Sequence, residues 1–201
     1  PGEVLMANGD GSYGVQQMPS YLGNVPSRGN SIKFPINIFL EGQEVALFYG
    51  WKTDGIFQSG DQMYLINGAM SQPGDIKVLD LNGDGQVDLA DRTIIGNPNP
   101  DFVYGFNLSM SYKDLSLRAL FNGTQGNEIV NGNYYRFGWA EGTYRNILGE
   151  AWNDRWTADN PAGSYPRLGY SANLFGALMD RVIEDGSYLR LKSITLNYDI
   201  P

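Results

Sequence analysis

A strict two-residue alternation is the feature that most constrains this sequence. From Phe102 to Tyr112, aromatic and aliphatic residues occupy every even position, and small or polar residues occupy most odd ones. Side chains of a β-strand point alternately to opposite faces, so the segment predicts a strand with one apolar face. Its length matches the roughly 9–11 residues of a tilted strand that crosses a bilayer, with aromatic residues at both ends. A strand of a soluble antiparallel sandwich has the same pattern, so both interpretations stay open on this feature alone.

Further strands are predicted on either side of this segment. Lys113 and Asp114 predict a tight turn, and residues 115–121 resume the alternation with Leu120 as the one exception, which completes a hairpin. Residues 45–57 predict a strand, a turn and a second strand, and residues 187–200 predict a final strand. Residues 1–33 predict loop or extended segments, and residues 131–180 predict long loops with one short helix near residues 147–156. We therefore expect an all-β fold of antiparallel strands.

Composition excludes several classes of function. The formal net charge of -8 argues against a nucleic-acid partner, because binding to phosphates needs a basic surface. The chain has no cysteine and no histidine, which excludes disulfides, thiolate or histidine catalysis and zinc sites built from these residues. No run of about 18 apolar residues exists, which excludes a transmembrane helix but not a spanning barrel. The chain begins without Met or a leader sequence, and we expect it to be a fragment cut at both ends.

The segment from Asp80 to Asp91 has the twelve-residue spacing of an EF-hand calcium loop. Oxygen donors stand at the first, third and fifth positions, glycine at the sixth, and carboxylates at the ninth and twelfth. We expect direct ligands from the side chains of Asp80, Asn82, Asp84 and Asp91, a backbone carbonyl ligand from Gln86, and a water-mediated contact from Asp88. The alternative is an acidic, glycine-rich turn in water, which we disfavour because four close carboxylates repel one another without a cation. The predicted role of calcium is to hold a loop together.

An ordered set of segments resembles the SusC/RagA-type TonB-dependent transporters of Bacteroidetes. Residues 48–58 read FYGWKTDGIFQ, residues 73–77 read PGDIK and run into the calcium loop, and residues 91–98 read DRTIIGNP. The segments PDFVYGF at 100–106, RWT with NP and PR between 155 and 167, and EDGSYLRLK at 184–192 follow in the family's order. The resemblance covers residues 44–201.

The resemblance implies that residues 1–201 are part of an outer-membrane β-barrel of about 22 strands, with long extracellular loops. The family imports glycans or peptides, with a plug domain inside the barrel and a SusD-like surface lipoprotein outside. Contact with TonB would come through an N-terminal part of the protein. We expect this chain to lack that part, and also the plug and the terminal strands. Outer-membrane lipid would contact the apolar faces of the strands.

No residue is predicted to be catalytic. The candidates for contact with an oligosaccharide or peptide ligand are the loop aromatics, because flat rings stack on sugars and on peptides alike. These are Trp139, Trp152, Trp156 and Tyr165. Packing within the loops or anchoring at the membrane interface explains the same residues at least as well. The competing function is a soluble, calcium-stabilised carbohydrate-binding module or glycosidase-associated domain, which would bury the apolar face of residues 102–112.

Overall fold

The computed structural model describes residues 3–7, 13–17, 36–40, 42–138, 146–169 and 178–200. The chain divides into two compact units, each described by itself below. Unit 1 comprises Pro1–Gly96 and Val130–Ile183, and unit 2 comprises Asn97–Ile129 and Glu184–Pro201. None of the helices in the described part of the chain has the length and hydrophobicity needed to cross a membrane.

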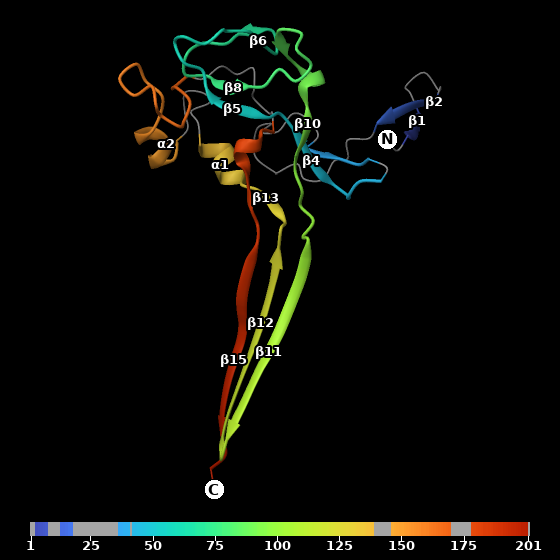
Figure 1. Ribbon diagram of the computed structural model, residues 1–201, viewed down its shortest axis with the longest axis vertical. Helices are drawn as coiled ribbons and strands as arrows, with labels where there is room; N and C mark the ends of the chain where they lie inside the picture. The colour runs from blue at the N-terminus through green and yellow to red at the C-terminus, as the bar shows by residue number, and fades with distance from the viewer. Residues whose placement is uncertain are drawn as a thin grey trace. The chain divides into compact units, whose positions relative to one another are not determined.

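Unit 2 is built on one antiparallel sheet of three long strands, which lie side by side in Figure 1. The strands are β11 (Phe102–Tyr112), β12 (Leu115–Gln125) and β15 (Tyr188–Tyr198), in the order β11-β12-β15. Lys113 takes a positive φ of 50° in the two-residue turn between β11 and β12. Pairing runs without interruption from Phe102 opposite Gln125 to Tyr112 opposite Leu115. The hairpin and the final strand predicted from the sequence are confirmed.

A bulge brings β15 into phase with β12. Leu120 pairs with Ser193, whereas the next residue, Phe121, pairs with Leu191, so Lys192 is an extra residue without a partner. A single extra residue moves all later side chains to the opposite face of the strand. Because of this shift, Ile194 and the apolar residues after it lie on the same face as Leu191.

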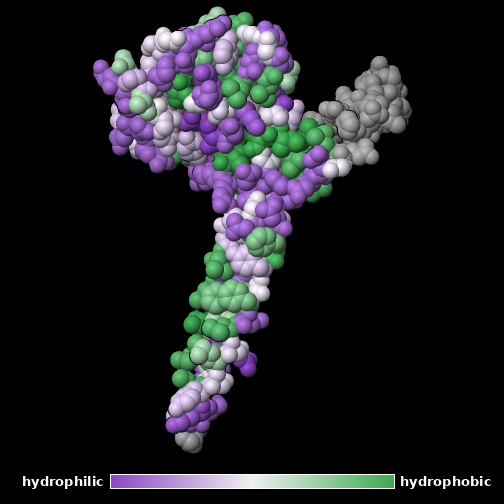
Figure 2. All heavy atoms as spheres, viewed as in Figure 1, coloured by the Kyte–Doolittle hydropathy of each residue, from purple (hydrophilic) through white to green (hydrophobic). Residues whose placement is uncertain are grey.

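The sheet of unit 2 has one apolar face and one mostly polar face. Figure 2 shows hydrophobic atoms gathered along the three long strands. The register places these apolar residues on one face, where they are exposed: Phe102, Phe106, Leu108, Met110, Tyr112, Leu115, Leu189, Leu191, Ile194, Leu196 and Tyr198. Gly123 is buried on this face, where a Cβ atom would lie 2.5 Å from the ring of Tyr104, so the glycine makes room for the aromatic ring.

Unit 1 consists of short strands and a few short helices. Most strand pairs are antiparallel, and β6 with β9 is a parallel pair. The strands are β1 (Glu3–Ala7), β2 (Tyr13–Gln17), β3 (Asn37–Ile38), β4 (Leu47–Gly50), β5 (Thr53–Ile56), β6 (Leu65–Ile66), β7 (Ala69–Met70), β8 (Ile76–Val78), β9 (Gln86–Val87) and β10 (Thr93–Gly96). The helices are α1 (Gly132–Phe137) and α2 (Gly149–Asn153), with 3-10 turns at Leu89–Asp91 and Asp180–Val182. Two further strands, β13 (Glu128–Val130) and β14 (Ile183–Asp185), pair with each other, and each has residues in both units.

A hydrophobic core holds unit 1 together. Trp51 and Phe57 are fully buried and pack with residues of β8 and with Leu178 and Met179. The backbone N–H of Trp51 donates to the carbonyl of Leu178 at 2.9 Å. The Thr53 hydroxyl donates to Asp180 at 2.6 Å. Segments more than a hundred residues apart in the sequence therefore share one core, which the sequence patterns did not predict.

The structure confirms the all-β prediction in outline, with mostly antiparallel strands and few helices. The helix predicted near residues 147–156 is α2, whereas α1 was not predicted. Loop or extended segments were predicted across residues 1–33, and the extended segments in the described part are β1 and β2, which pair with each other. A count of about 22 strands and the closure of a barrel stay predictions.

Candidate functional site

The predicted calcium loop, residues 80–91, forms a tight turn in unit 1. Gly83 and Gly85 adopt left-handed backbone angles, with φ of 77° and 85°, which residues with a Cβ rarely adopt. The carboxylate of Asp80 accepts hydrogen bonds from the N–H groups of Gly83 at 2.7 Å and Gly85 at 2.8 Å. These backbone N–H groups, that of Gly85 above all, hold the pKa of Asp80 below its usual value. The backbone of the loop thus stabilises the charged form of the carboxylate at the first position.

The side chain of Asp91, at the twelfth position, accepts hydrogen bonds from residues near both ends of the loop. Its side chain is fully buried and accepts hydrogen bonds from the N–H groups of Leu81 at 2.8 Å, Asn82 at 3.3 Å and Asp88 at 2.8 Å. The indole N–H of Trp51 donates to the Asp88 carbonyl at 2.8 Å and ties the loop to the core. Asp91 thus joins both ends of the loop through the protein's own hydrogen bonds.

The residues at the predicted ligand positions fit a hard cation, since each of them offers an oxygen atom. The side chains of Asn82, Asp84 and Gln86 are exposed, and the N–H groups of residues 84 and 86 are bound by Asn82 and Asp84. Among the described residues, no three or more Asp or Glu side chains lie close enough together to hold a metal ion. Calcium binding by this loop therefore stays a prediction that rests on the donors and their spacing, and the predicted ligands would have to move together to bind the ion.

Of the three predicted aromatic contacts that the structure describes, Trp152 is the one that lies open to solvent. Its side chain, on α2, is 50% exposed. The guanidinium of Arg155 lies over its ring, 4.0 Å from the centroid, and donates to the Trp152 carbonyl. Trp139 lies outside the described residues. A ligand-binding role for these residues stays a prediction.

Trp156 and Tyr165 are neighbours that pack within unit 1. The backbone N–H of Trp156 donates to the Tyr165 carbonyl at 2.7 Å, and its indole N–H donates to Gln58 at 3.2 Å. Tyr165 contacts the ring of Tyr134, with the centroids 5.8 Å apart. Desolvation raises the pKa of Tyr165 to about 12. These contacts favour a packing role for both residues over a role in ligand stacking.

The family-like segments PGD and PR meet in an ion pair that sequence patterns did not reveal. The guanidinium of Arg167 donates to the Asp75 carboxylate at 2.8 Å, and Asp75 is almost fully buried. The backbone N–H of Arg167 also donates to the carbonyl of Gly74 at 2.8 Å. Gly74 has a φ of 88°, and a Cβ there would lie 2.5 Å from the ring of Trp156. The PGD segment (residues 73–75) and the PR segment (residues 166–167) are thus held together by an ion pair and a backbone hydrogen bond, and we call this contact the joint.

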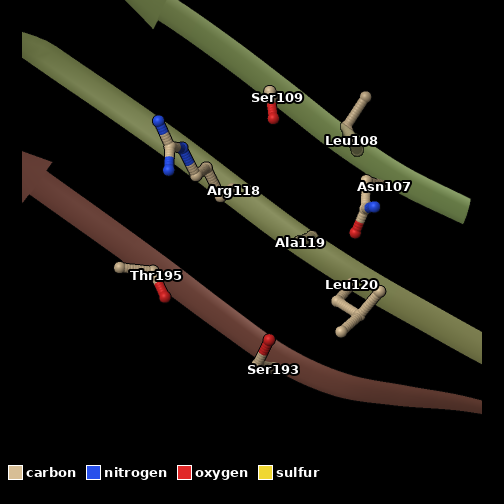
Figure 3. A pocket seen from close by; sticks show the side chains of 8 residues that line it. All are labelled: Asn107, Leu108, Ser109, Arg118, Ala119, Leu120, Ser193 and Thr195. Carbon is tan, nitrogen blue, oxygen red and sulfur yellow. The ribbon is translucent and has the colours of Figure 1, made fainter.

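The polar face of the long sheet in unit 2 carries a shallow hollow that the sequence did not nominate as a site. Its volume is about 420 Å³. Figure 3 shows the residues that line it, which come from β11, β12 and β15: Asn107, Leu108, Ser109, Arg118, Ala119, Leu120, Ser193 and Thr195. Alternation had predicted a small and polar face here, but not that Arg118 lies among hydroxyl and amide groups from the two neighbouring strands, β11 and β15.

An exposed apolar face on long antiparallel strands, backed by a polar face, is typical of proteins that cross the outer membrane with strands. Comparison with known proteins points to the same class. Two TonB-dependent receptors of Formosa agariphila are similar to this chain. One is 34% identical over 163 residues, which is 80% of the chain and 16% of that receptor. The other is 31% identical over 179 residues, which is 86% of the chain and 17% of that receptor.

Among solved structures, the RagAB peptide transporter is similar in fold and sequence. The TM-score is 0.56 and the identity 26%, over 84% of this chain and 18% of that one. No family model matches the chain. The resemblance to SusC/RagA-type TonB-dependent transporters predicted from the sequence is therefore confirmed. The chain spans about a sixth of the length of the curated relatives it matches.

Proposed function

We propose that this chain is part of a TonB-dependent transporter of the outer membrane, in which unit 2 contributes three strands of the barrel. The observation that carries the proposal is the exposed apolar face of β11, β12 and β15. In water such a face is unfavourable, because burying apolar surface stabilises a protein by about 25 cal/mol per Å², and an exposed face does not gain this free energy. When the same surface faces lipid, its apolar side chains lie in an apolar environment, and the strands have the length that a bilayer requires.

The transporter imports glycans or peptides and works with a SusD-like lipoprotein on the cell surface. The similarity to the RagAB peptide transporter supports the peptide alternative. Energy would arrive from TonB through a part of the protein outside this chain. No described residue is assigned a catalytic role, and the relatives are receptors and a transporter rather than enzymes.

The alternative, a soluble calcium-stabilised carbohydrate-binding module, has less support. A soluble module buries its apolar sheet face, whereas Met110, Ile194 and Leu196 are each at least 60% exposed. Unit 1 does have a packed core, but that core is compatible with a loop region of a transporter as well. The exposed apolar face of unit 2 therefore supports the transporter over the soluble module.

Calcium binding at residues 80–91 is a second part of the proposal. The donor spacing and the two left-handed glycines support it, and the contact between Trp51 and the Asp88 carbonyl links the loop to the core. The ion would offset the repulsion among the loop's carboxylates. Its role would be to stiffen the loop, without a catalytic function.

The test combines cell fractionation with labelling of matched cysteine pairs. This chain has no cysteine, so single cysteines can be placed on either face of one strand in the full-length product. Met110→Cys and Leu196→Cys probe the apolar face, and their neighbours Ser109→Cys and Thr195→Cys probe the polar face. A lipid-soluble maleimide should label the first pair in intact outer membranes, and a water-soluble maleimide should prefer the second pair.

Fractionation supplies an independent readout. The native product should be several times larger than the 22.2 kDa of this chain and should leave the membrane only with detergent. A product that a salt wash releases, with all four cysteines labelled alike by the water-soluble reagent, would overturn the proposal in favour of the soluble module.

A further inference from the structure

Asparagine is followed directly by glycine at five positions of this chain: Asn8, Asn67, Asn82, Asn122 and Asn131. In such a pair the backbone nitrogen of glycine can attack the side-chain amide carbon of asparagine, because glycine has no side chain that hinders the approach. The reaction converts asparagine to aspartate without an enzyme, so the surroundings of each pair set its rate. Asn8 lies outside the described residues, and the structure distinguishes the other four pairs.

Three of these pairs are held by regular structure. Asn122 lies in the central strand β12 and pairs with residues of β11 on one side and β15 on the other. The side-chain oxygen of Asn131 caps helix α1 by accepting the N–H of Tyr134 at 2.9 Å. The backbone N–H of Asn67 donates to the Val87 carbonyl at 2.8 Å, in the turn between β6 and β7. Reaction at each of these pairs first requires local opening of the structure around it.

The fourth pair, Asn82 and Gly83, lies exposed in the loop of residues 80–91. A Cβ added at Gly83 would meet no atom within 4 Å, so the space around this glycine is open. The N–H of Asp84 donates to the side-chain oxygen of Asn82 at 2.9 Å. This hydrogen bond withdraws electrons from the amide carbon, and it stabilises the negative charge that develops on the oxygen during attack.

The nitrogen of Gly83 remains open to react. Its N–H donates to the carboxylate of Asp80 at 2.7 Å. An N–H bond lies in the plane of its peptide group, so this contact does not cover the face through which the nitrogen attacks. Both hydrogen-bond partners of the pair, Asp80 and Asp84, belong to the same short loop, so the reaction breaks no strand pairing or helix cap.

We propose that Asn82 is a deamidation site, and that the reaction changes the third ligand position of the predicted calcium loop. Hydroxide removes the N–H proton of Gly83, and the nitrogen forms a bond to Cγ of Asn82. The bond from Cγ to the side-chain nitrogen breaks, and ammonia leaves after taking a proton from water. Water then opens the succinimide ring at one of its two carbonyl carbons, which leaves aspartate or isoaspartate at this position.

The product adds a negative charge to a loop that already holds four aspartates: Asp80, Asp84, Asp88 and Asp91. Without a cation, the new carboxylate increases the repulsion among these groups. Bound calcium should slow the reaction, because coordination would fix the side chain of Asn82 on the ion and prevent the rotation that attack requires. This protective effect rests on the proposed calcium binding, whereas deamidation itself does not.

The test incubates the full-length protein in detergent, in mildly alkaline buffer with EGTA to remove calcium. Digestion under acidic conditions and mass spectrometry then give the deamidated fraction at each pair. Asn82 should react at least about tenfold faster than Asn67, Asn122 or Asn131, because no regular structure has to open. Gly83→Ala should slow the reaction severalfold, because a methyl group hinders the attack. Its φ of 77° would strain alanine and loosen the loop, so a slower reaction cannot come from local unfolding.

An equal rate at Asn82 and at any of the three held pairs would overturn the inference, as would a Gly83→Ala variant that reacts as fast as the wild type. Excess calcium should lower the rate at Asn82 and leave the rate at Asn122 unchanged. If terbium luminescence shows that the loop binds the ion and calcium still does not slow the reaction, the protective effect is refuted. If the loop binds no ion, the proposed calcium site fails, and the rates in EGTA decide separately whether Asn82 is a deamidation site.

Discussion

Replacing Arg167 by methionine is expected to loosen the joint between the PGD and PR segments of unit 1. Arg167 donates to the Asp75 carboxylate at 2.8 Å, and the side chain of Asp75 is only 4% exposed. Methionine keeps most of the apolar stem of arginine and removes the charge. The variant therefore leaves a buried carboxylate without its cation, with little change in packing.

The expected loss of stability in Arg167→Met depends on how completely each partner of the ion pair is buried. Removing one partner of a buried ion pair costs about 3–5 kcal/mol. The side chain of Arg167 is 25% exposed, so water reaches part of the pair, and the N–H of Gln72 still donates to Asp75 at 2.9 Å. We therefore expect a loss of about 2–3 kcal/mol in the free energy of local opening. This loss corresponds to roughly 30- to 140-fold faster exchange of the amides that the joint protects.

Hydrogen–deuterium exchange of the full-length protein in detergent measures this opening directly. Two backbone hydrogen bonds report on the joint. The N–H of Gly74 donates to the Phe57 carbonyl at 2.8 Å, and the N–H of Arg167 donates to the Gly74 carbonyl at 2.8 Å. Both amides should exchange faster in Arg167→Met, after correction for the intrinsic rates of the new sequence.

Lys77→Met is the matched control. The Nζ of Lys77 lies 3.4 Å from Asp54 and 3.8 Å from Asp61, whose side chains are 63% and 30% exposed. Exposed ion pairs contribute about 0–1 kcal/mol, so exchange should rise by no more than roughly fivefold. If Lys77→Met speeds exchange as much as Arg167→Met does, burial does not set the cost and the reasoning is refuted. Adding Asp75→Asn to Arg167→Met should restore part of the protection, because a neutral amide is less costly to bury than an unpaired carboxylate.

Three further predictions concern unit 1. Gly74→Ala forces a Cβ to within 2.5 Å of the Trp156 ring at a φ of 88°, and should cost about 2 kcal/mol or more in thermal unfolding, whereas Gly60→Ala, with open space around its Cβ, should cost much less. Terbium added to the calcium-free protein should luminesce on tryptophan excitation; excess calcium should quench this signal, and Asp84→Asn should weaken it, whereas a signal unchanged by both would argue against the calcium site. Desolvation raises the pKa of Tyr64 to about 12 from 10, so its contribution to stability is complete below pH 10 and is lost as the pH rises towards 12; Tyr64→Phe should show a smaller fall of the unfolding midpoint over that range.

Sequence reasoning succeeded where structure is local. The hairpin of β11 and β12 was predictable because alternation and a two-residue turn at Lys113 and Asp114 are properties of neighbouring residues. The core of unit 1 was not predictable in this way. Its strands are two to five residues long, and Trp51 bridges to Met179, more than a hundred residues away. The hydrophobic periodicity of a short segment does not predict contacts between residues so far apart in the sequence.

The same distinction applies to the candidate sites. The spacing of Asp80–Asp91 identified a set of oxygen donors, because a calcium loop is a local motif. The spacing did not reveal that Asp91 is fully buried and already holds the N–H groups of Leu81 and Asp88. Likewise, Trp152, Trp156 and Tyr165 looked equivalent in sequence, and only their surroundings separate the exposed ring from the packed ones.

The bulge at Lys192 brings the apolar residues of β15 before and after it to the same face of the sheet. With strict alternation from Leu191, the face of that residue would next hold Ser193 and Thr195, and Ile194 would lie on the polar face. The extra residue reverses the phase, so that the apolar residues on both sides of the bulge share one face. A soluble sheet with one exposed face could tolerate a mixed outer surface. A continuous apolar face along the full length of β15 is instead what a hydrocarbon environment requires, and this continuity is a further physical argument that the strand faces lipid.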